Sequence, residues 1–287
     1  MAAKKLQITF FNVGHGSCTH IITPNNQHFL VDVGSDEQES VVNYINQYYS
    51  LQRNGQKIDY LIITHPHKDH ILDLPTLLRS PISPRVLFRE KKAFPIENAQ
   101  TYSDQILFDC ANKMNQDYHF PIDSLNDPEN PNYNGGVSFS LHRDLSYHKE
   151  EDLNSFSPII VLSYAGRKVI LTGDNNKEIL KTWVAEGPTM CTSVKDCDVL
   201  LAPHHGRDSD FCPEFFHVAN PRLTVVSDKA KEHDTQLNTT TNYKGRGLFI
   251  NGEERYVVTT RKDGNILVTI EEDGRLNVQL GAFDYGN

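Results

Sequence analysis

The chain has 287 residues, of which 38% are hydrophobic and 23% are charged, and its formal net charge is −9 at pH 7. This composition supports a sizeable core and argues against wholesale disorder, and no apolar run is long enough to span a membrane. The acidic balance disfavours a nonspecific polyanion binder, because phosphate contacts depend on clustered Lys and Arg, although bound cations can reverse the charge locally.

Strand and helix signals alternate along the first half of the chain. Short β-branched or aromatic runs bounded by Gly, Asn and Pro predict strands, and apolar residues at helical spacing predict helices. Strands are expected at 6–13, 18–23, 28–34, 59–64 and 85–90, and helices at about 37–49, 71–80 and 101–115. Residues 124–136 are polar and rich in Pro and Asn, which predicts a loop.

The second half repeats this rhythm. Strands are expected at 137–142, 158–164, 168–174, 197–202 and 222–228, and helices at 176–186 and 209–219. Near the end, Asp263-Gly264 is expected to turn a β-hairpin, and a further strand follows Asp273-Gly274. Two β-rich halves with helices outside predict an α/β sandwich.

The N-terminal sequence has a broken apolar run and no small-residue cleavage site, so it is expected to be a strand and not a signal peptide. Five cysteines without a CxxC pair are typical of reduced thiols. We therefore expect a cytoplasmic protein with no membrane association.

The stretch YLIITHPHKDHI places an H-x-H-x-D-H cluster directly behind an apolar strand. Alternate residues of an extended segment point the same way, so His65 and His67 can reach one metal ion together. After a turn, Asp69 and His70 can reach a second ion. Imidazole and carboxylate groups suit zinc, and also manganese or iron.

Three further strands end in polar residues of the same kind. Asp32 follows FLV, Asp174 follows VILTG, and the pair His204-His205 follows VLLAP. Each signal is weak alone, but the same topological position recurs, and this favours one shared site.

These motifs resemble, in content and order, those of the metallo-β-lactamase superfamily. The chain is most similar to the ComEC-type branch, which comprises the nuclease-like domain of DNA-uptake proteins and its stand-alone relatives. FFNVGHGS, NSFSPIIVLSYAGRKVILTGD, LLAPHHG and YVVTTRKDGNILV carry the resemblance. It covers about residues 6–271 and matches poorly at 90–135, within one expected domain of residues 1–287.

The resemblance implies an αββα sandwich with two divalent metal ions, most simply Zn²⁺ and alternatively Mn²⁺. It assigns His65 and His67 to the first ion and Asp69, His70 and His205 to the second, with Asp174 bridging. Asp32 would hydrogen-bond the ligand loop and not bind metal. Whether His204 or His205 is the ligand stays open. 

Some positions depart from the family pattern. The histidine expected about twenty residues before Asp174 is absent, and Asn154 stands near that place. The first ion would then be weakly held, or completed by His148. His15 stands where the branch often has Gln, and Glu232-His233-Asp234 occupies the neighbourhood of a common His-Pro.

The expected function is a metal-dependent phosphodiesterase or nuclease acting on DNA or another nucleotide phosphodiester through an activated water. Asp69 would orient the water, and His204 or His233 would serve as general acid. Arg207, His15 and Asn154 would contact the substrate. Two alternatives remain: hydrolysis of a lactone, thioester or amide, or a metal-binding subunit of an assembly such as a defence complex. The sequence leaves the oligomeric state and any protein partner open.

Overall fold

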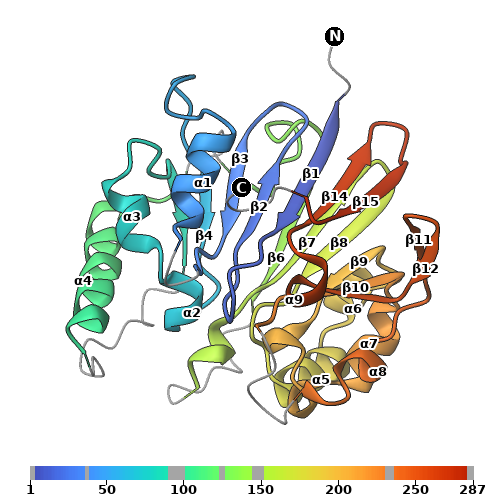
Figure 1. The fold of residues 1–287 in the computed structure, drawn as a ribbon. Coiled ribbons are helices and arrows are strands. Elements are labelled where there is room, and N and C mark those ends of the chain that lie inside the picture. The colour runs from blue at the N-terminus through green and yellow to red at the C-terminus, as the bar shows by residue number, and fades with distance from the viewer. Residues whose placement is uncertain are drawn as a thin grey trace.

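The computed structural model describes residues 4–35, 39–89, 101–122, 127–143, 152–229 and 236–282. Two β-sheets stack face to face, and helices cover both outer faces, as Figure 1 shows. The expected αββα sandwich is therefore confirmed. Within these ranges, no helix has the length and apolarity that crossing a membrane would require.

The first sheet has seven strands in the order β15-β14-β1-β2-β3-β4-β5. Their bounds are Lys5–Phe10 (β1), Thr19–Ile22 (β2), His28–Val31 (β3), Tyr60–Ile62 (β4), Val86–Phe88 (β5), Ile266–Glu271 (β14) and Leu276–Leu280 (β15). β3, β4 and β5 run parallel, and the other neighbours pair antiparallel.

The second sheet has six strands in the order β13-β10-β9-β8-β7-β6. Their bounds are Ser138–His142 (β6), Ile159–Tyr164 (β7), Arg167–Leu171 (β8), Val199–Leu201 (β9), Leu223–Val226 (β10) and Val257–Thr259 (β13). β8, β9, β10 and β13 run parallel, whereas β6, β7 and β8 pair antiparallel. A separate two-stranded ribbon joins β11 (Leu248–Ile250) to β12 (Glu253–Arg255).

Buried apolar side chains pack between the two sheets and also between each sheet and its outer helices. Between the sheets, Phe29 of β3 stacks on Phe139 of β6 with ring centroids 4.4 Å apart. Leu30, the next residue of β3, points to the opposite face and packs with the helices outside the first sheet. Burial on both faces explains why these strands are continuously apolar and do not alternate.

The outer helices have the following bounds: Val41–Tyr48 (α1), Lys68–Ile71 (α2), Leu74–Arg79 (α3), Tyr102–Asp117 (α4), Lys177–Glu186 (α5), Pro188–Val194 (α6), Pro213–Ala219 (α7), Thr239–Asn242 (α8) and Thr260–Asp263 (α9). α1, α3 and α4 share a core with the first sheet, and α5, α6 and α7 share one with the second. The described residues also form 3₁₀ turns at Leu153–Phe156 (η3), Pro203–Gly206 (η4) and Asp208–Asp210 (η5).

The hairpin expected at Asp263-Gly264 is wrong. β13 and β14 lie in different sheets, and the chain crosses between them through α9. Asp263 accepts a hydrogen bond from the Thr259 backbone N–H and pairs with Arg255. The contact with Thr259 spans the single turn of α9, and Gly264 caps the C-terminal end of this helix. The Asp-Gly pair therefore ends a helix here. The second pair, Asp273-Gly274, does turn the β14–β15 hairpin.

Candidate metal centre

Strand ends from both sheets deliver the candidate ligands to one edge of the sandwich. His65 follows β4, and α2 carries Asp69 and His70 immediately afterwards. Asp174 follows β8, and His205 lies in η4 after β9. Because β4 runs parallel to β3 and β8 runs parallel to β9, their carboxyl ends lie on the edge where open α/β sheets commonly bind ligands.

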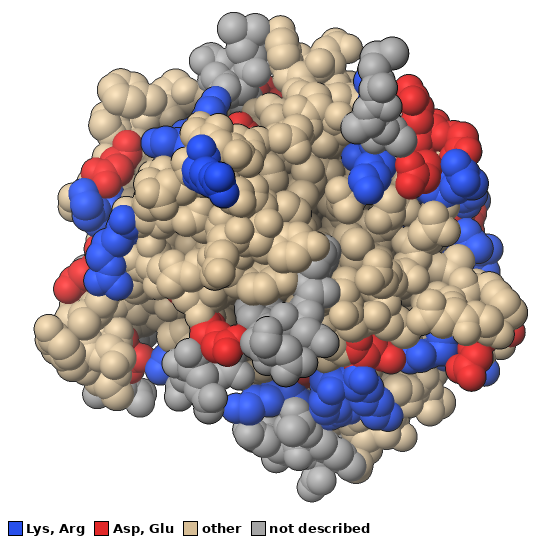
Figure 2. All heavy atoms as spheres, turned by 45° about the horizontal axis from the view of Figure 1, so that its top comes forward, with Lys and Arg blue, Asp and Glu red and all other residues tan. Residues whose placement is uncertain are grey.

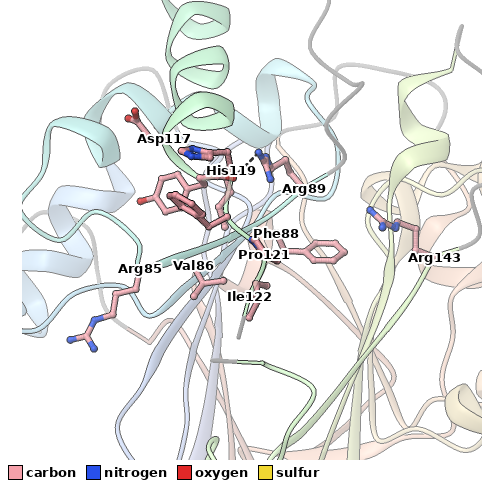
Figure 3. Close-up of a pocket in the computed structure, with 12 residues that line it drawn as sticks. Arg85, Val86, Phe88, Arg89, Asp117, His119, Pro121, Ile122 and Arg143 are labelled. Atoms are coloured by element: carbon pink, nitrogen blue, oxygen red, sulfur yellow. Dashed lines mark hydrogen bonds between the residues drawn. The ribbon is translucent and has the colours of Figure 1, made fainter. Parts of the chain in front are cut away.

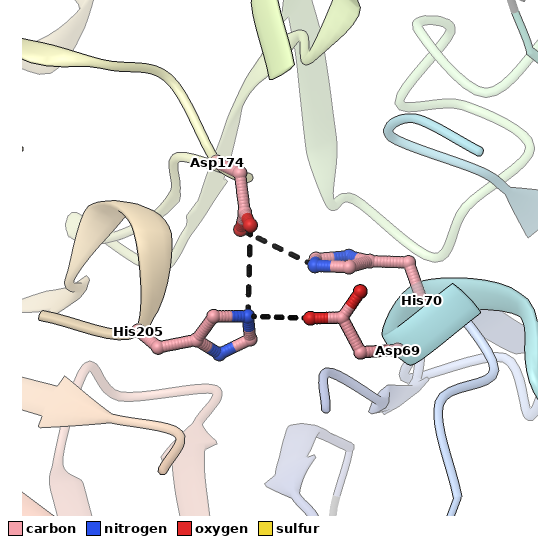
Figure 4. A group of neighbouring side chains, drawn as sticks. All are labelled: Asp69, His70, Asp174 and His205. Carbon is pink, nitrogen blue, oxygen red and sulfur yellow. Dashed lines mark ion pairs between the residues drawn. The ribbon is translucent and has the colours of Figure 1, made fainter. Parts of the chain in front are cut away.

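Four side chains form a cluster that can hold a cation, called here the four-residue cluster: Asp69, His70, Asp174 and His205. One ligand atom from each lies within 4.8 Å of all the others. His205 Nε2 is 3.3 Å from Asp69 Oδ2 and 3.5 Å from Asp174 Oδ2. His70 Nε2 is 3.3 Å from Asp174 Oδ1, and Figure 4 shows these groups pointing toward one another.

His65 and His67 lie next to the four-residue cluster. His65 Nε2 is 3.7 Å from Asp174 Oδ2 and 3.1 Å from His67 Nδ1. The His65 ring also lies 4.0 Å from the His70 ring, centroid to centroid. Asp174 is therefore shared by His65 and by the histidines of the four-residue cluster, as a bridging carboxylate would be.

Hydrogen bonds behind the rings orient the histidines of the four-residue cluster. Asp32 Oδ2 is 2.7 Å from His70 Nδ1, and Asp32 also accepts hydrogen bonds from the backbone N–H and hydroxyl of Thr64. His205 Nδ1 lies 2.9 Å from the carbonyl oxygen of Ser227, to which it can donate. Each ring thus turns Nε2 toward Asp174, as carboxylate–histidine–metal arrangements require.

The donor atoms fit a divalent cation. Among the described residues, the buried Nε2 atoms of His70 and His205 have no hydrogen-bond partner. Buried polar atoms in native proteins almost always have one, so a missing partner needs an explanation. Imidazole nitrogens and carboxylate oxygens are the ligands that zinc and manganese accept, and a bound ion would satisfy both atoms.

The charges of the four-residue cluster also favour a bound cation. Burial raises the pKa of Asp174, but the neighbouring His70 and His205 outweigh burial and hold this pKa well below its ordinary range. Burial raises the pKa of Asp69 as well, but the neighbouring His205, whose Nε2 lies 3.3 Å from Asp69 Oδ2, outweighs burial and lowers this pKa below its ordinary value. Conversely, burial lowers the pKa of His70 and His205, yet the Asp174 carboxylate outweighs it and raises both. Imidazole protons thus balance the carboxylates, and a metal ion can replace those protons.

Close backbone packing holds the loops in place. Gly173 precedes Asp174 with φ of +55°, and a Cβ added there would lie 2.7 Å from Ser157 Cβ. Ser157 Oγ in turn accepts a hydrogen bond from the Asp174 N–H and lies 3.3 Å from His65 Nδ1. The close packing therefore requires glycine at position 173, directly before Asp174.

The other expected site residues lie at different distances from the cluster. His204 Nε2 is 3.8 Å from Asp174 Oδ2. His15 lies at the rim, with Nε2 3.9 Å from Asp69 Oδ2. Burial and the neighbouring His205 lower the pKa of His15 despite the Asp69 charge, and the Arg207 charge lowers it further. Arg207 is half-buried directly after η4.

Asn154 lies in η3, and its side-chain oxygen is buried without a hydrogen-bond partner among the described residues. His148 and His233, expected as a ligand and as a general acid, lie outside the described residues.

Sequence reasoning assigned no role to Ser157, Ser227 and Asp210. Ser157 closes the Asn-x-x-Ser pattern that begins at Asn154, so that pattern offered a signal for it. Ser227 acts through its backbone carbonyl, which carries no residue-specific signal. Asp210 Oδ2 lies 2.7 Å from His204 Nδ1, a proximity created by the turn at η4 and not evident from spacing.

A hollow of about 620 Å³ lies between the edge strands β5 and β6 (Figure 3). Arg89 follows β5 and Arg143 follows β6, and both line it. By strand register, Arg89 lies level with the segment leading to His65, and Arg143 lies near the start of β7 beside Ser157. Arg89 and Arg143 therefore lie at the same edge of the sheets as the metal-binding residues, although the residues that line the hollow include none of the four-residue cluster.

An αββα sandwich with a His/Asp cluster at one edge defines a class of candidate metallohydrolases. The chain belongs to the metallo-beta-lactamase superfamily, whose model matches residues 12–210. Recombination protein 2 of Haemophilus influenzae is 23% identical over 224 residues, which make up 77% of this chain but only 24% of that protein. The chain thus spans about a quarter of that relative, and the match supports the resemblance to the ComEC-type branch.

Two solved structures are similar over most of the chain. The metallo-beta-lactamase fold protein YhfI from Bacillus subtilis has a TM-score of 0.49 at 13% identity, covering 96% of this chain and 99% of that one. A long form RNase Z from yeast has a TM-score of 0.44 at 11% identity, covering 95% of this chain and 42% of that one.

Proposed function

We propose that the protein is a metal-dependent phosphodiesterase that acts on DNA or another nucleotide phosphodiester. The observation that carries this proposal is the position of Asp174, whose two carboxylate oxygens lie 3.3–3.7 Å from the Nε2 atoms of His65, His70 and His205. This arrangement suits two cations that share one carboxylate, as in two-metal hydrolytic sites.

The first ion would be held by His65 and His67, and the second by Asp69, His70 and His205, with Asp174 common to both. Zn²⁺ is the favoured ion and Mn²⁺ the alternative. When bound, such ions lower the pKa of water and neutralise charge on a phosphate.

The two carboxylates of the site differ in their access to solvent. The Asp69 side chain is 27% exposed, whereas that of Asp174 is 5% exposed. Asp69 is therefore the carboxylate that an incoming water molecule can reach. Since its pKa lies below the ordinary range, it is ionised at neutral pH and can accept a hydrogen bond that orients this water.

Substrate contacts are proposed for residues at the rim. Arg207 and His15 flank η4, and a guanidinium there can grip a phosphate with two hydrogen bonds. Asn154 would act from η3, and His233 is retained as a proton donor. Arg143 extends the positive charge along the same edge.

The surface charge favours a substrate that is gripped locally. On the face toward the top of Figure 1, away from α2, Lys, Arg, Asp and Glu lie around a broad uncharged area (Figure 2). The formal net charge of −9 also disfavours broad attraction of a long polyanion. We therefore favour a short single-stranded or small nucleotide substrate, held by a few residues beside the metal site.

Hydrolysis assays with metal-stripped protein test the proposal. Bis(p-nitrophenyl) phosphate and labelled single-stranded DNA are offered while Zn²⁺ or Mn²⁺ is titrated. Asp69→Asn should abolish turnover, and Asp273→Asn, on the exposed β14–β15 turn, should not change it. Arg143→Ala should raise KM for the oligonucleotide more than for the small ester.

A lack of cleavage would refute the proposed reaction. If protein shown to retain its metals cleaves neither phosphodiester, the proposed reaction is wrong. Lactone, thioester and amide substrates then become the next to test, followed by candidate partner proteins.

A further inference from the structure

The histidines that surround Asp174 share one orientation. His65, His70, His204 and His205 each bring Nε2 within 3.3–3.8 Å of an Asp174 oxygen. His204, His65 and His205 approach the same atom, Oδ2, at 3.8, 3.7 and 3.5 Å. Two ligand atoms bound to one tetrahedral zinc at about 2.0–2.1 Å lie roughly 3.4 Å apart, so His204 lies at a ligand's distance from Asp174, as His65 and His205 do.

The backbone of η4 is what makes two adjacent histidines converge. Neighbouring residues in an extended chain point to opposite sides. His204 and His205 instead both have positive φ, at 47° and 55°, which is uncommon for residues other than glycine. Two such residues in succession keep both rings on the Asp174 side. Strained backbone of this kind is concentrated at functional sites.

Each of these four rings also has an acceptor behind it. Nδ1 of His65 lies 3.3 Å from Ser157 Oγ, and the His70 and His205 rings have the partners described above. Asp210 holds the same place for His204, with Oδ2 2.7 Å from Nδ1, although the direction departs from that of a regular hydrogen bond. Both side chains are only 13% exposed. A carboxylate at Nδ1 favours the proton on that nitrogen and leaves the Nε2 lone pair free for a cation.

We infer that His204 is a ligand of the first ion, with His65, His67 and Asp174, and that Asp210 positions its ring. His204 and His205 would then serve different ions, and His204 would not be a free proton donor. This inference rests on the metal site of the proposed function but not on the reaction.

Metal stoichiometry tests the inference without any activity readout. Metal-stripped full-length protein is titrated with Zn²⁺ by calorimetry, and retained metal is counted after dialysis. The wild type should bind two equivalents, and His204→Ala should lose one. His217→Ala, an exposed histidine on α7, is the matched control and should keep both.

Double variants identify which ion is lost. If His204 and His65 serve one ion, the double variant His65→Ala/His204→Ala should still bind one equivalent. His204→Ala/His205→Ala removes a ligand from each site and should bind none tightly. Asp210→Asn keeps the ligand, so it should retain two ions and weaken the first by about 10–100-fold. This variant also covers the case in which His204→Ala does not fold, as judged by circular dichroism.

Two results overturn the inference: His204→Ala binding two equivalents with wild-type affinity, or a wild type with a single ion that His204→Ala does not disturb. The proposed reaction can fail separately. A protein that binds two ions, loses one in His204→Ala and cleaves no phosphodiester would sustain the ligand assignment and refute the phosphodiesterase.

Discussion

A buried histidine pair far from the metal residues makes a quantitative prediction about acid stability. His20 of β2 and His28 of β3 are 0% and 2% exposed, and His20 Nε2 lies 3.0 Å from His28 Nδ1. Their rings stack, and the Tyr49 ring packs edge-on against both. Burial lowers the pKa of His28 to about 4 and holds the pKa of His20 well below its ordinary value.

The sign follows from proton binding. In the unfolded chain His28 has a pKa of about 6.5, so between about pH 6.5 and pH 4 the unfolded state binds more protons than the folded state. Stability that is fully present above pH 6.5 is therefore lost as the pH falls toward 4. From these two pKa values, His28 alone should cost about 2 kcal/mol of unfolding free energy between pH 7 and pH 5.

The comparison of wild type with His28→Gln isolates this contribution. Glutamine keeps a polar group beside His20 but does not titrate. Urea unfolding near pH 7 and near pH 5 can be followed by fluorescence of Trp183, the single tryptophan, with circular dichroism as a second probe. The variant should lose about 2 kcal/mol less than the wild type on acidification. Equal losses would show that His28 is not buried and neutral, and would refute the reasoning.

Three further predictions concern the metal centre. Asp32→Asn should weaken metal affinity by about 10–100-fold in calorimetry, because Asp32 orients His70; unchanged affinity would contradict this role. Gly173→Ala should lower the free energy of urea unfolding by about 1–3 kcal/mol, because the alanine Cβ would meet Ser157 and the backbone has a positive φ. Gly166→Ala is the control: Gly166 also has a positive φ, but a Cβ there would meet no other atom, so only the backbone strain applies. Chelation should lower the melting temperature, since ions present at about 1,000 times Kd add about 4 kcal/mol; an unchanged melting temperature would contradict metal binding by the folded protein.

Local sequence patterns predicted most of the sandwich and most of the ligands. The apolar runs that end in His65, Asp174 and His205 are buried strands, and their polar ends meet because parallel strands share an edge. The candidate metal ligands are His and Asp residues a few positions after a strand, and this pattern can be read directly from the sequence.

Long-range pairing explains what local patterns missed. Asp263-Gly264 carries a hairpin signal, yet β13 pairs with β10 and β14 pairs with β1, over thirty residues or more in each case. The true hairpin between β11 and β12 turns at Asn251-Gly252 and was not predicted, although Asn-Gly is a strong turn signal. Its strands have three residues each, too short for periodicity to register.

In the candidate site, too, local sequence patterns predicted some features and missed those that depend on the folded backbone. The approach of Asp210 to His204 depends on two successive positive φ values, and the spacing of residues in the sequence does not predict that conformation. Asn154, by contrast, occupies the place that the family pattern gives it, in η3, and its substrate role stays a prediction.

The pairing of β1 with β14 has a consequence for how the chain folds. Lys5 lies opposite Glu271, so the edge of β1 that faces away from β2 stays unpaired until β14 has been made. Contacts this distant in sequence slow folding, because the entropy cost of closing the loop comes before the contacts form. Until β14 pairs with it, β1 presents an open edge to any other strand. A chain that has made β1 but not yet β14 is therefore exposed to aggregation, and chaperone demand should depend on the arrival of β14.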